Sequence, residues 1–325
     1  MQAVFWGVRG SYPVPGPDTV RYGGNTSCVE IRTDAGERLI IDAGTGLVRL
    51  GEQLATQGQL LGDFHLLLSH LHWDHIQGLP YFAPIYQQGS KVSLHGLRSD
   101  VDKLPEVLRR VARHEFFPVS MDEWSARLSF HEVHAGRRFG AAAFQVRPFR
   151  LNHPFGAVGY RVDADGASCA YVCDTAPFFQ VLHKKHFLRG PEPLDAADRR
   201  SLQRLRKGLV DAIRGCDTVI YDTHYTPEEY LRFPHFGHST PDHALDLCAG
   251  QGIRCLVLFH HAPNHTDEQM DQISAHYQEA GARLGMEVIT AREGLSLPVR
   301  DRGPALAPPE VLAESRPEVL GRGQP

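Results

Sequence analysis

The sequence predicts an α/β sandwich in which β-sheets lie inside and α-helices lie outside. Strand-like runs follow one another in the first part of the chain, and strand-like and helical segments alternate afterwards. Hydrophobic residues make up 42% and charged residues 22%, which is typical of a globular protein. The 325 residues are enough for one large domain.

Each expected strand is short, rich in Val, Ile, Leu or Phe, and bounded by Gly, Asp or Pro. The expected strands are 3–8, 27–32, 38–42, 64–69, 91–95, 144–149, 157–162, 168–173, 218–222, 255–259 and 287–290. Apolar residues at helical spacing predict helices at 47–57, 99–113, 198–214, 240–249 and 267–283. Good capping residues begin the last two, at Thr240 and at Thr266 or Asp267.

Residues 1–297 carry no linker-like stretch, so we expect them to form one domain. Residues 298–325 contain repeated prolines and predict an irregular tail. Residues 99–128 are interpreted as a compact helical cover.

Composition excludes several classes of protein. No apolar run approaches the length of a membrane span, and the N-terminus lacks the features of a signal peptide. The six cysteines form no CxxC pair, which favours buried reduced thiols. We therefore expect a cytoplasmic protein with no membrane partner. A net charge of −4 without a long Lys/Arg block argues against long nucleic acid and for a small anionic substrate.

The most informative stretch is His70-Leu71-His72-Trp73-Asp74-His75, directly after an expected strand. His70 and His72 are two positions apart, so on an extended backbone they point to the same side. Asp74 and His75 follow where the chain must turn, so they can face a second ion. Imidazole and carboxylate together suit zinc, manganese or iron. The alternative, packed or solvated histidines, is weaker because the cluster follows a buried-strand pattern.

Three further potential ligands lie at the carboxyl ends of later expected strands. His153 follows the strand 144–149, Asp174 follows 168–173, and His260 follows 255–259. A single tetrahedral site would not need this many ligands, whereas two adjacent ions would.

The order HxHxDH, His, Asp, His, each after a strand, resembles the metallo-β-lactamase superfamily. Residues 39–46 resemble the first motif of that superfamily, and the resemblance extends to about residue 295. It implies an αββα sandwich of two mixed β-sheets flanked by helices. It also implies two divalent metal ions, with zinc expected first and manganese or iron as alternatives.

The superfamily pattern implies a distribution of the seven ligands over two ions. His70, His72 and His153 would hold one ion, Asp74, His75 and His260 the other, and Asp174 would bridge them. Asp42 would brace the HxHxDH loop without touching metal. His261 neighbours His260 in a strand and should point the opposite way, so His261 is expected to support the ligands only.

Other residues resemble the phosphodiesterase side of the superfamily. Aspartate as the bridging ligand resembles RNase Z, whereas the β-lactamases proper place cysteine there. Cys173 sits one position early and is expected to face away. The segment 237–240 resembles the RNase Z loop whose histidine lies over the scissile phosphate, which assigns that role to His238. Asp222 would orient it. His238 could instead be only a residue at the start of a helix, and a role for His224 is left open.

The blocks 7–11 and 21–28 resemble bacterial stand-alone metallo-hydrolases, many of them labelled cyclic-nucleotide phosphodiesterase-like. Arg9, Arg21 and Asn25 in these blocks are candidate substrate-binding residues, because an arginine in a Gly-rich turn can approach a phosphate. The alternative is that they order the N-terminal loops. The chain departs from RNase Z in lacking a long Gly/Pro-rich basic arm.

We therefore expect a dinuclear metal-dependent hydrolase acting on a small phosphodiester such as a cyclic nucleotide. A hydroxide bridging the metals would attack phosphorus, Asp74 would accept a proton, and His238 with Asp222 would act on the leaving oxygen. Alternatives are an RNase Z-like endoribonuclease and an ester or lactone hydrolase. A non-catalytic sensor is least favoured because all seven ligands are present. The resemblance also allows a homodimer.

Overall fold

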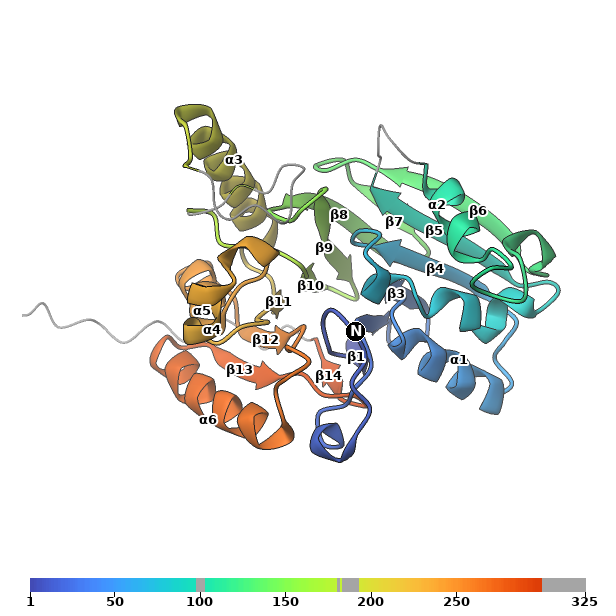
Figure 1. Ribbon diagram of the computed structural model, residues 1–325, viewed down its shortest axis with the longest axis horizontal. Helices are drawn as coiled ribbons and strands as arrows, with labels where there is room; N and C mark the ends of the chain where they lie inside the picture. Colours follow the sequence, from blue (N-terminus) through green and yellow to red (C-terminus); the bar gives the residue numbers. More distant parts are fainter. Residues whose placement is uncertain (98–102, 180–181, 183–192, 300–325) are drawn as a thin grey trace, which may run out of the picture.

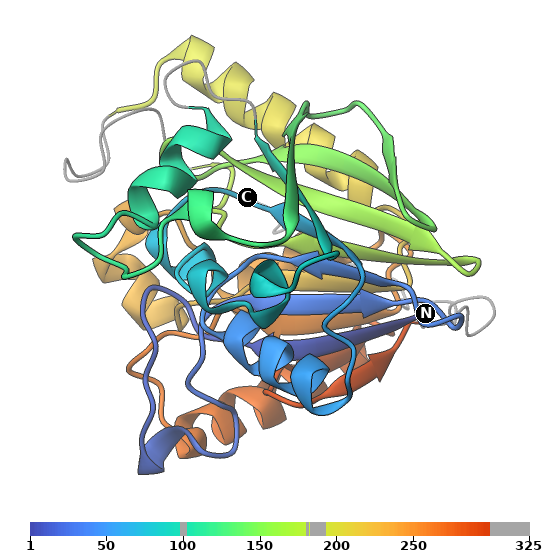
Figure 2. The same cartoon turned by 90° about the vertical axis from the view of Figure 1, so that its right-hand side faces the viewer.

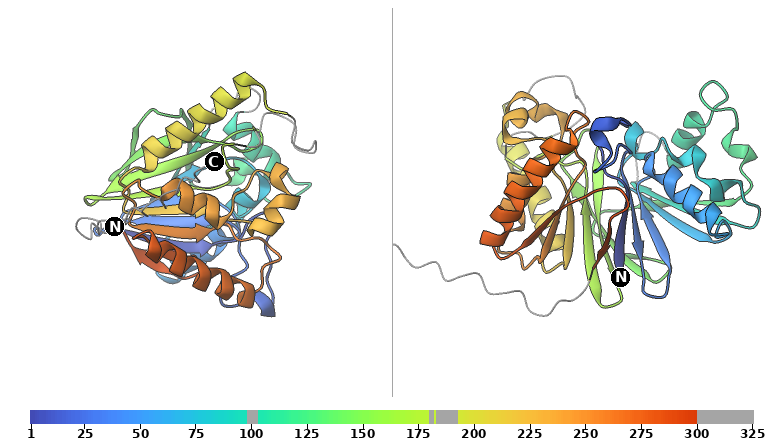
Figure 3. Two further views of the ribbon diagram at one scale, coloured as in Figure 1. Left: turned by 90° about the vertical axis from the view of Figure 1, so that its left-hand side faces the viewer. Right: turned by 90° about the horizontal axis from the view of Figure 1, so that it is seen from below.

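Two seven-stranded β-sheets lie face to face, and helices cover both outer faces (Figure 1). The layers are seen edge-on in the right-hand view of Figure 3. The computed structural model describes residues 1–97, 103–179, 182 and 193–299. The predicted αββα sandwich of two mixed sheets is confirmed. That residues 1–297 form one domain stays a prediction. The expected irregular tail, 298–325, starts too early, because Pro298 ends a strand and Val299 is buried, and residues 300–325 lie outside the described residues.

The first sheet has the order β14-β1-β2-β3-β4-β5-β6. Its strands are β1 (Gln2–Gly7), β2 (Cys28–Arg32), β3 (Arg38–Ile41), β4 (Asp63–Leu68), β5 (Lys91–Leu97), β6 (Arg127–Val133) and β14 (Ser296–Pro298). The half from β14 to β3 pairs antiparallel, and the half from β3 to β6 pairs parallel.

The second sheet has the order β13-β12-β11-β10-β9-β8-β7. Its strands are β7 (Phe139–Ala141), β8 (Phe144–Leu151), β9 (Ala157–Ala164), β10 (Ala167–Val172), β11 (Thr218–Asp222), β12 (Cys255–Phe259) and β13 (Glu287–Thr290). It also divides into an antiparallel half, β7 to β10, and a parallel half, β10 to β13. In both parallel halves the carboxyl ends of the strands meet at one edge, where ligands commonly bind.

The helices connect the parallel strands and pack on the outer faces. They are α1 (Gly46–Thr56), α2 (Leu104–Val111), α3 (Ala196–Ile213), α4 (Pro227–Arg232), α5 (Pro241–Cys248) and α6 (Asp267–Arg283). Helices α1 and α2 share an apolar cluster with the first sheet and face the viewer in Figure 2. Helices α3, α5 and α6 share another with the second sheet. Among the described helices, none is long and apolar enough to cross a membrane.

Alternating side chains separate the outer clusters from the core between the sheets. In β4, Leu66 and Leu68 pack under α1, whereas Leu67 points to the other sheet. In the second sheet, Tyr171 and Phe259 fill the inner face. Burial on both faces explains why these strands appear in the sequence as continuous apolar runs.

Four elements were not expected from the sequence: β6, β7, β14 and α4. Strand β6 lies at the sheet edge and is largely half-exposed or exposed, so polar residues such as Ser129 and His131 interrupt its apolar pattern. The expected helix 99–113 is shorter: its described part begins at Leu104, and residues 99–102 lie outside the described residues. The expected helical cover 99–128 thus also contains the start of a strand.

Candidate metal centre

The HxHxDH segment leaves β4 at the edge between the two sheets. His72 is still extended, and the next three residues form the short 3-10 turn Trp73–His75. This turn reverses the chain and brings Asp74 and His75, both buried, back toward His70. The ring of His70 lies 4.4 Å from that of His72 and 4.3 Å from that of His75. A six-residue segment therefore presents four ligand groups to one space.

The second sheet brings three more groups to the same space. His153 follows β8, Asp174 follows β10 and His260 follows β12, and all three are buried. Asp174 and His260 have φ angles of 60° and 63°, in the left-handed region. Their chains therefore leave the strand direction at these positions, which turns both side chains toward the first sheet.

Asp174 lies between two groups of histidines. Its Oδ2 is 3.5 Å from Nε2 of both His70 and His153. Its Oδ1 is 3.3 Å from His75 Nε2 and 3.1 Å from His260 Nε2. Each carboxylate oxygen thus faces a different group of ligands, as a bridging residue would.

The remaining two ligands complete the groups. Nδ1 of His72 lies 3.1 Å from His153 Nε2. The Asp74 carboxylate oxygen Oδ2 lies 3.3 Å from His75 Nε2 and 3.4 Å from His260 Nε2. Ligand atoms of His70, His72, His153 and Asp174 all lie within 4.8 Å of one another. The structure therefore brings all seven predicted ligands together, in the two groups that the resemblance implied.

Unpartnered nitrogens show that this donor set fits cations. Nε2 of His70, His75 and His260 are buried without a hydrogen-bond partner, which is costly unless another group binds them. Burial, with neighbouring histidines, lowers the pKa of His70 and His153, so both are neutral and offer a lone pair. Imidazole and carboxylate donors in two adjoining groups suit two divalent ions.

The environment of His75 differs from that of the other histidines. Burial alone would lower its pKa, but Asp74, Asp174 and Asp42 raise it well above the ordinary value. His75 would hold a cation through Nε2 only after that nitrogen loses its proton, which makes cation binding pH-dependent.

Asp42 holds the HxHxDH loop in place through hydrogen bonds. This fully buried carboxylate, at φ 62°, accepts hydrogen bonds from Ser69 N (2.7 Å), Ser69 Oγ (2.8 Å), His75 Nδ1 (2.8 Å) and Tyr171 Oη (2.7 Å). The bond to Nδ1 fixes the ring of His75 with Nε2 toward the centre. The sequence indicated Asp42, but the contribution of Tyr171 comes from the opposite sheet and had no local signal.

His238 stands beside the ligands and is held by Asp222. His238 Nδ1 donates to Asp222 Oδ2 at 3.0 Å, and the ring lies 5.1 Å from that of His260 and 5.5 Å from that of His153. Asp222 also accepts from the backbone N–H of Thr175. Burial lowers the pKa of His238, but Asp222 outweighs burial and raises the pKa to about 9.

The structure also locates the two histidines whose positions were less certain. His224 is buried, donates from Nδ1 to the carbonyl of His260 (2.9 Å), and stacks on His238 at 4.4 Å. It therefore lies inside the polar cluster and not on the surface. His261 points away from the ligands and donates from Nε2 to the carbonyl of Ala291 at 2.9 Å.

The three candidate substrate-binding residues have structural partners. Arg9 is fully buried and its guanidinium donates to the carbonyls of Gly23, Ala262 and His265. Arg21 pairs with carboxylates at the start of α6. Asn25 donates to Glu293 at 2.8 Å. These contacts correspond to the alternative, in which the three residues order the N-terminal loops.

Cys173 was expected to face away from the centre, but in the structure it faces the ligands. Its Sγ lies 3.0 Å from Asp174 Oδ1 and within 4.8 Å of ligand nitrogens of His75 and His260. The expectation extrapolated strand alternation, but β10 ends at Val172 and the positive φ of Asp174 folds its carboxylate back toward the thiol. Burial and the neighbouring carboxylates raise the pKa of Cys173, so it stays a thiol that donates to Asp174.

The N-terminal loop contributes contacts that the sequence did not indicate. The backbone N–H of Ser11 donates to Asp74 Oδ2 at 2.8 Å. A Cβ at Gly10 would lie 2.5 Å from a ring atom of His260, so only glycine fits there without displacing the ligand. The Gly-rich block 7–11 was noticed, but its contact with the ligands depends on folding across the whole chain.

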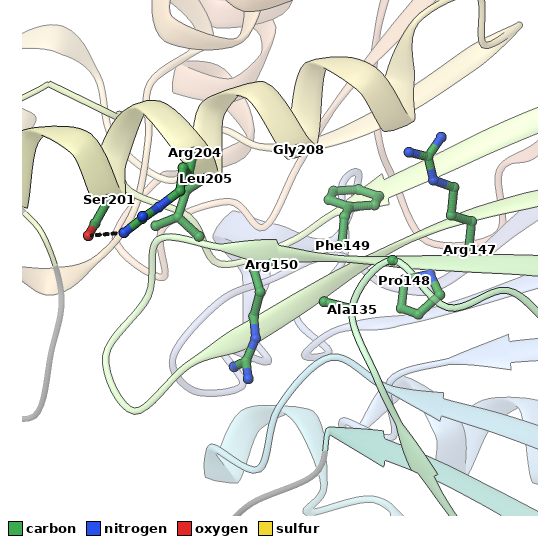
Figure 4. A pocket seen from close by; sticks show the side chains of 10 residues that line it. Ala135, Arg147, Pro148, Phe149, Arg150, Ser201, Arg204, Leu205 and Gly208 are labelled. Atoms are coloured by element: carbon green, nitrogen blue, oxygen red, sulfur yellow. Dashed lines mark hydrogen bonds between the residues drawn. The ribbon is translucent and has the colours of Figure 1, made fainter.

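A separate cavity of about 430 Å³ lies between α3 and β8 (Figure 4). Arg147 and Arg204 extend on the α3 side of β8, whereas Arg150 extends from the other side of the strand. None of the seven predicted ligands lines this cavity. It is therefore distinct from the cluster at the sheet edge.

Comparisons with known proteins agree with this fold. The Beta-lactamase superfamily domain matches residues 37–189. Ribonuclease Z of Haloferax volcanii is 25% identical over 286 residues, covering 80% of this chain and 84% of that protein. The metallo-beta-lactamase fold protein YhfI from Bacillus subtilis has a TM-score of 0.63 at 13% identity, covering 91% of this chain and 97% of that one. A diphosphatase from the PhnP family has a TM-score of 0.58 at 20% identity, covering 92% and 98%.

Proposed function

We propose that this chain, which resembles the metallo-β-lactamase superfamily in sequence and fold, is a dinuclear metal-dependent hydrolase that cleaves a small anionic phosphodiester. The observation that carries this proposal is the position of Asp174. Its two oxygens face two separate groups of ligands, and the His238–Asp222 pair stands beside them. Related proteins named ribonuclease Z and diphosphatase act at phosphorus, which supports the same chemistry here.

Two divalent ions at these ligands, with zinc expected and manganese or iron as alternatives, would lower the pKa of a water and screen the phosphate charge. We assign to Asp74 the role of proton acceptor in this reaction. Burial by itself raises the pKa of Asp74, but His75 and His260 outweigh it and hold the pKa well below its usual value. The Ser11 N–H donates to the same oxygen and keeps the carboxylate in place.

His238 is the proposed proton donor to the leaving oxygen. Asp222 occupies Nδ1 of His238, so Nε2 is left to face a substrate. A pKa raised to about 9 keeps His238 protonated at neutral pH, as an acid requires. Cations at the neighbouring ligands would repel this proton and bring the pKa down toward neutrality.

An RNase Z-like endoribonuclease is the second candidate. The relation to ribonuclease Z over most of the chain favours it, and so does helix α3, which exposes Arg199, Arg200, Arg204 and Arg206. Cleavage of precursor tRNA would identify this activity, whereas turnover of cyclic nucleotides or bis(p-nitrophenyl) phosphate without it supports the small substrate. Activity on lactones alone would indicate the ester-hydrolase alternative.

The variant His238→Ala tests the proposal. We expect it to keep both metal ions, because His238 is not among the ligands, and to lose about 10²–10⁴-fold of its turnover of bis(p-nitrophenyl) phosphate. His235→Ala, three positions earlier in the same loop, is the matched control and should retain turnover. Unchanged activity in His238→Ala removes this residue from the mechanism, and loss of metal would assign it a structural role.

Two further expectations belong to this proposal. We propose a cytoplasmic location because all six cysteines are buried free thiols, as in reducing compartments. The homodimer implied by resemblance stays a prediction, which light scattering of the purified protein tests.

A further inference from the structure

Three exposed aromatic residues lie in the chain within two residues of a metal ligand or of a residue that contacts one. Trp73 is 55% exposed and lies in the chain between the ligands His72 and Asp74. Phe155 is 68% exposed, follows His153 by two residues, and its ring is edge-on to the ring of His72 at 6.4 Å. Tyr12 is 58% exposed and follows Ser11, which donates to Asp74. Large apolar surfaces thus lie next to the most polar cluster of the molecule.

Phe155 gains little for the fold from this position. An exposed ring recovers little of the free energy that burial would provide. Its φ of 60° is moreover in the left-handed region, where a bulky residue is strained and where glycine or asparagine would be easier to place. Neither burial nor backbone conformation therefore explains a phenylalanine here.

Backbone strain in this chain is concentrated at the metal centre. Among the described residues, seven other than glycine have positive φ. Ala142 and Asp165 lie in the hairpin turns β7–β8 and β9–β10, and Phe155 lies in the β8–β9 hairpin loop that also carries the ligand His153. The other four, Ser11, Asp42, Asp174 and His260, lie at the centre or contact its ligands. Phe155 thus differs from Ala142 and Asp165 because its hairpin loop also carries a metal ligand, so its strained position lies next to functional groups.

We propose that Phe155 and Trp73 form an aromatic rim that stacks on a planar ring of the substrate. The substrates would then be phosphodiesters whose retained group, and not the leaving group, carries a nucleobase, and diesters with a simple alkyl group in that place would be poor substrates. Aromatic faces gain most from other flat rings, and every base offers such a face. This inference rests on the proposed phosphodiester chemistry, since it specifies the group attached to the phosphate.

Binding can be measured without catalysis, because Trp73 is a built-in probe. Trp6 donates to the buried Glu30 and Trp124 is buried, so the exposed Trp73, which lies in the chain between two ligands, is the tryptophan that should respond to a bound ligand. Adenosine 5′-monophosphate should quench the fluorescence, and ribose 5-phosphate, which has the same sugar and phosphate but no base, should not. The quenching should disappear in Trp73→Phe.

The variant Phe155→Leu removes stacking but keeps an apolar side chain at the same φ. We expect it to weaken binding of adenosine 5′-monophosphate about tenfold, the factor that corresponds to about 1.4 kcal/mol and lies within the range for one stacked base. Phe155→Tyr should retain binding. Phe116→Leu, at another exposed phenylalanine, is the matched control and should bind like the parent.

Turnover separates this inference from the proposed function. Thymidine 5′-p-nitrophenyl phosphate and methyl p-nitrophenyl phosphate release the same leaving group and differ in the nucleoside. Phe155→Leu should lower the ratio of their kcat/KM values about tenfold, mainly through KM for the nucleoside substrate. An equal loss on both substrates, or no quenching in the parent protein, overturns the aromatic rim and leaves the phosphodiesterase intact. Quenching that depends on Phe155 in a protein that hydrolyses neither diester supports the rim and refutes the proposed function.

Discussion

The two sheets supply the metal ligands in different ways. The first sheet supplies four ligand groups from six consecutive residues, which side-chain hydrogen bonds to Asp42 hold in place. The second sheet supplies three, from separate loops between positions 153 and 260, and two of them, Asp174 and His260, sit at positive φ. One half of the centre is thus a compact loop braced by a buried carboxylate, and the other half is assembled by strand topology and backbone strain.

This difference teaches which half the centre depends on more. In the first half, four neighbouring residues provide metal ligands, and Asp42 holds their loop in place through hydrogen bonds. In the second half, Asp174 alone faces both groups of ligands. We therefore expect substitutions at the junction to have the largest effect and substitutions farther from it to have progressively smaller ones.

Asp174→Ala should have the largest effect. Without the carboxylate between the two groups, metal content should fall from about two ions per chain to below one. Turnover should fall by about three orders of magnitude or more, because several kcal/mol of charge stabilisation is lost. Plasma mass spectrometry measures the metal content, and diester hydrolysis measures the turnover.

Asp217→Ala is the matched control. The Asp217 carboxylate accepts hydrogen bonds from Ser168 near the other end of β10, so this variant should lose stability without losing metal. Two ions retained in Asp174→Ala would contradict the bridging role.

Asp42→Ala should damage the first-sheet half. Four buried donors lose their acceptor, so the free energy of unfolding should fall by about 3–5 kcal/mol. The affinity for the ion held by His75 should fall about 10–100-fold. Chemical denaturation and metal titration measure these changes. Asp165→Ala is the control, because Asp165 has a similar positive φ in a hairpin turn but no such buried network. If Asp165→Ala lowered the free energy of unfolding as much as Asp42→Ala, backbone strain and not the hydrogen-bond network would be responsible.

Tyr171→Phe should have a smaller effect, because it removes one of the four donors to Asp42 and keeps the packing of the ring. We expect a loss of about 1–2 kcal/mol in the free energy of unfolding and full metal content. Tyr160→Phe is a close control, since Tyr160 Oη donates at 2.6 Å to the carbonyl of Leu68 and not to Asp42. A weaker metal affinity in Tyr171→Phe only would show that the second sheet also acts through the first-sheet brace.

Glu229→Gln should have the smallest effect on the metal centre, leaving metal content and turnover unchanged, and its effect on stability should depend on pH. Glu229 joins α4 to the loop after β12 through His265 at 2.8 Å. Burial raises its pKa, but His265 and the Thr226 N–H outweigh burial and lower it to about 2. Because the pKa in the folded state is below that of the unfolded chain, the stabilisation is present above about pH 4.5 and is lost toward pH 2.

The measurable difference follows from that sign. Glu229→Gln should lower the free energy of unfolding by about 1–2 kcal/mol at pH 7, and by progressively less as the pH falls below 4.5. The exposed neighbour gives the control Glu228→Gln, which should match the parent at both pH values. A constant difference across this range would show that the charge of Glu229 is not responsible.

The same contrast explains how much was predictable from the sequence. The HxHxDH loop was evident because its ligands are adjacent, and the strands of both sheets were evident because burial makes them continuously apolar. His153, Asp174 and His260 could be selected only by assuming that carboxyl ends of strands meet. The edge strand β6 and the short strands β7 and β14 had too few buried residues to give a pattern.

Orientation at strand ends was the least predictable property. Alternation along β10 predicted that Cys173 faces away from the centre. The left-handed backbone at Asp174 instead brings the Asp174 carboxylate to the Cys173 thiol. The carbonyls that bind the guanidinium of Arg9 belong to residues 23, 262 and 265, which are distant in the sequence from Arg9. The residues next to Arg9 in the sequence therefore do not indicate whether its side chain is buried or exposed to substrate. Such contacts depend on tertiary structure, which a local pattern does not encode.

The pairing of β14 with β1 has a consequence for assembly of the protein. Residues 296–298 add the outermost strand to the first sheet, next to residues 2–4 of β1. The loop that follows β1 contains Ser11, which donates to Asp74. The metal ligands likewise come from segments far apart in sequence, for example His70, Asp174 and His260. Contacts between such distant segments form slowly during folding. Metal capture should be among the final events of folding, and a chain released before its last strand pairs would collect its cations late or not at all.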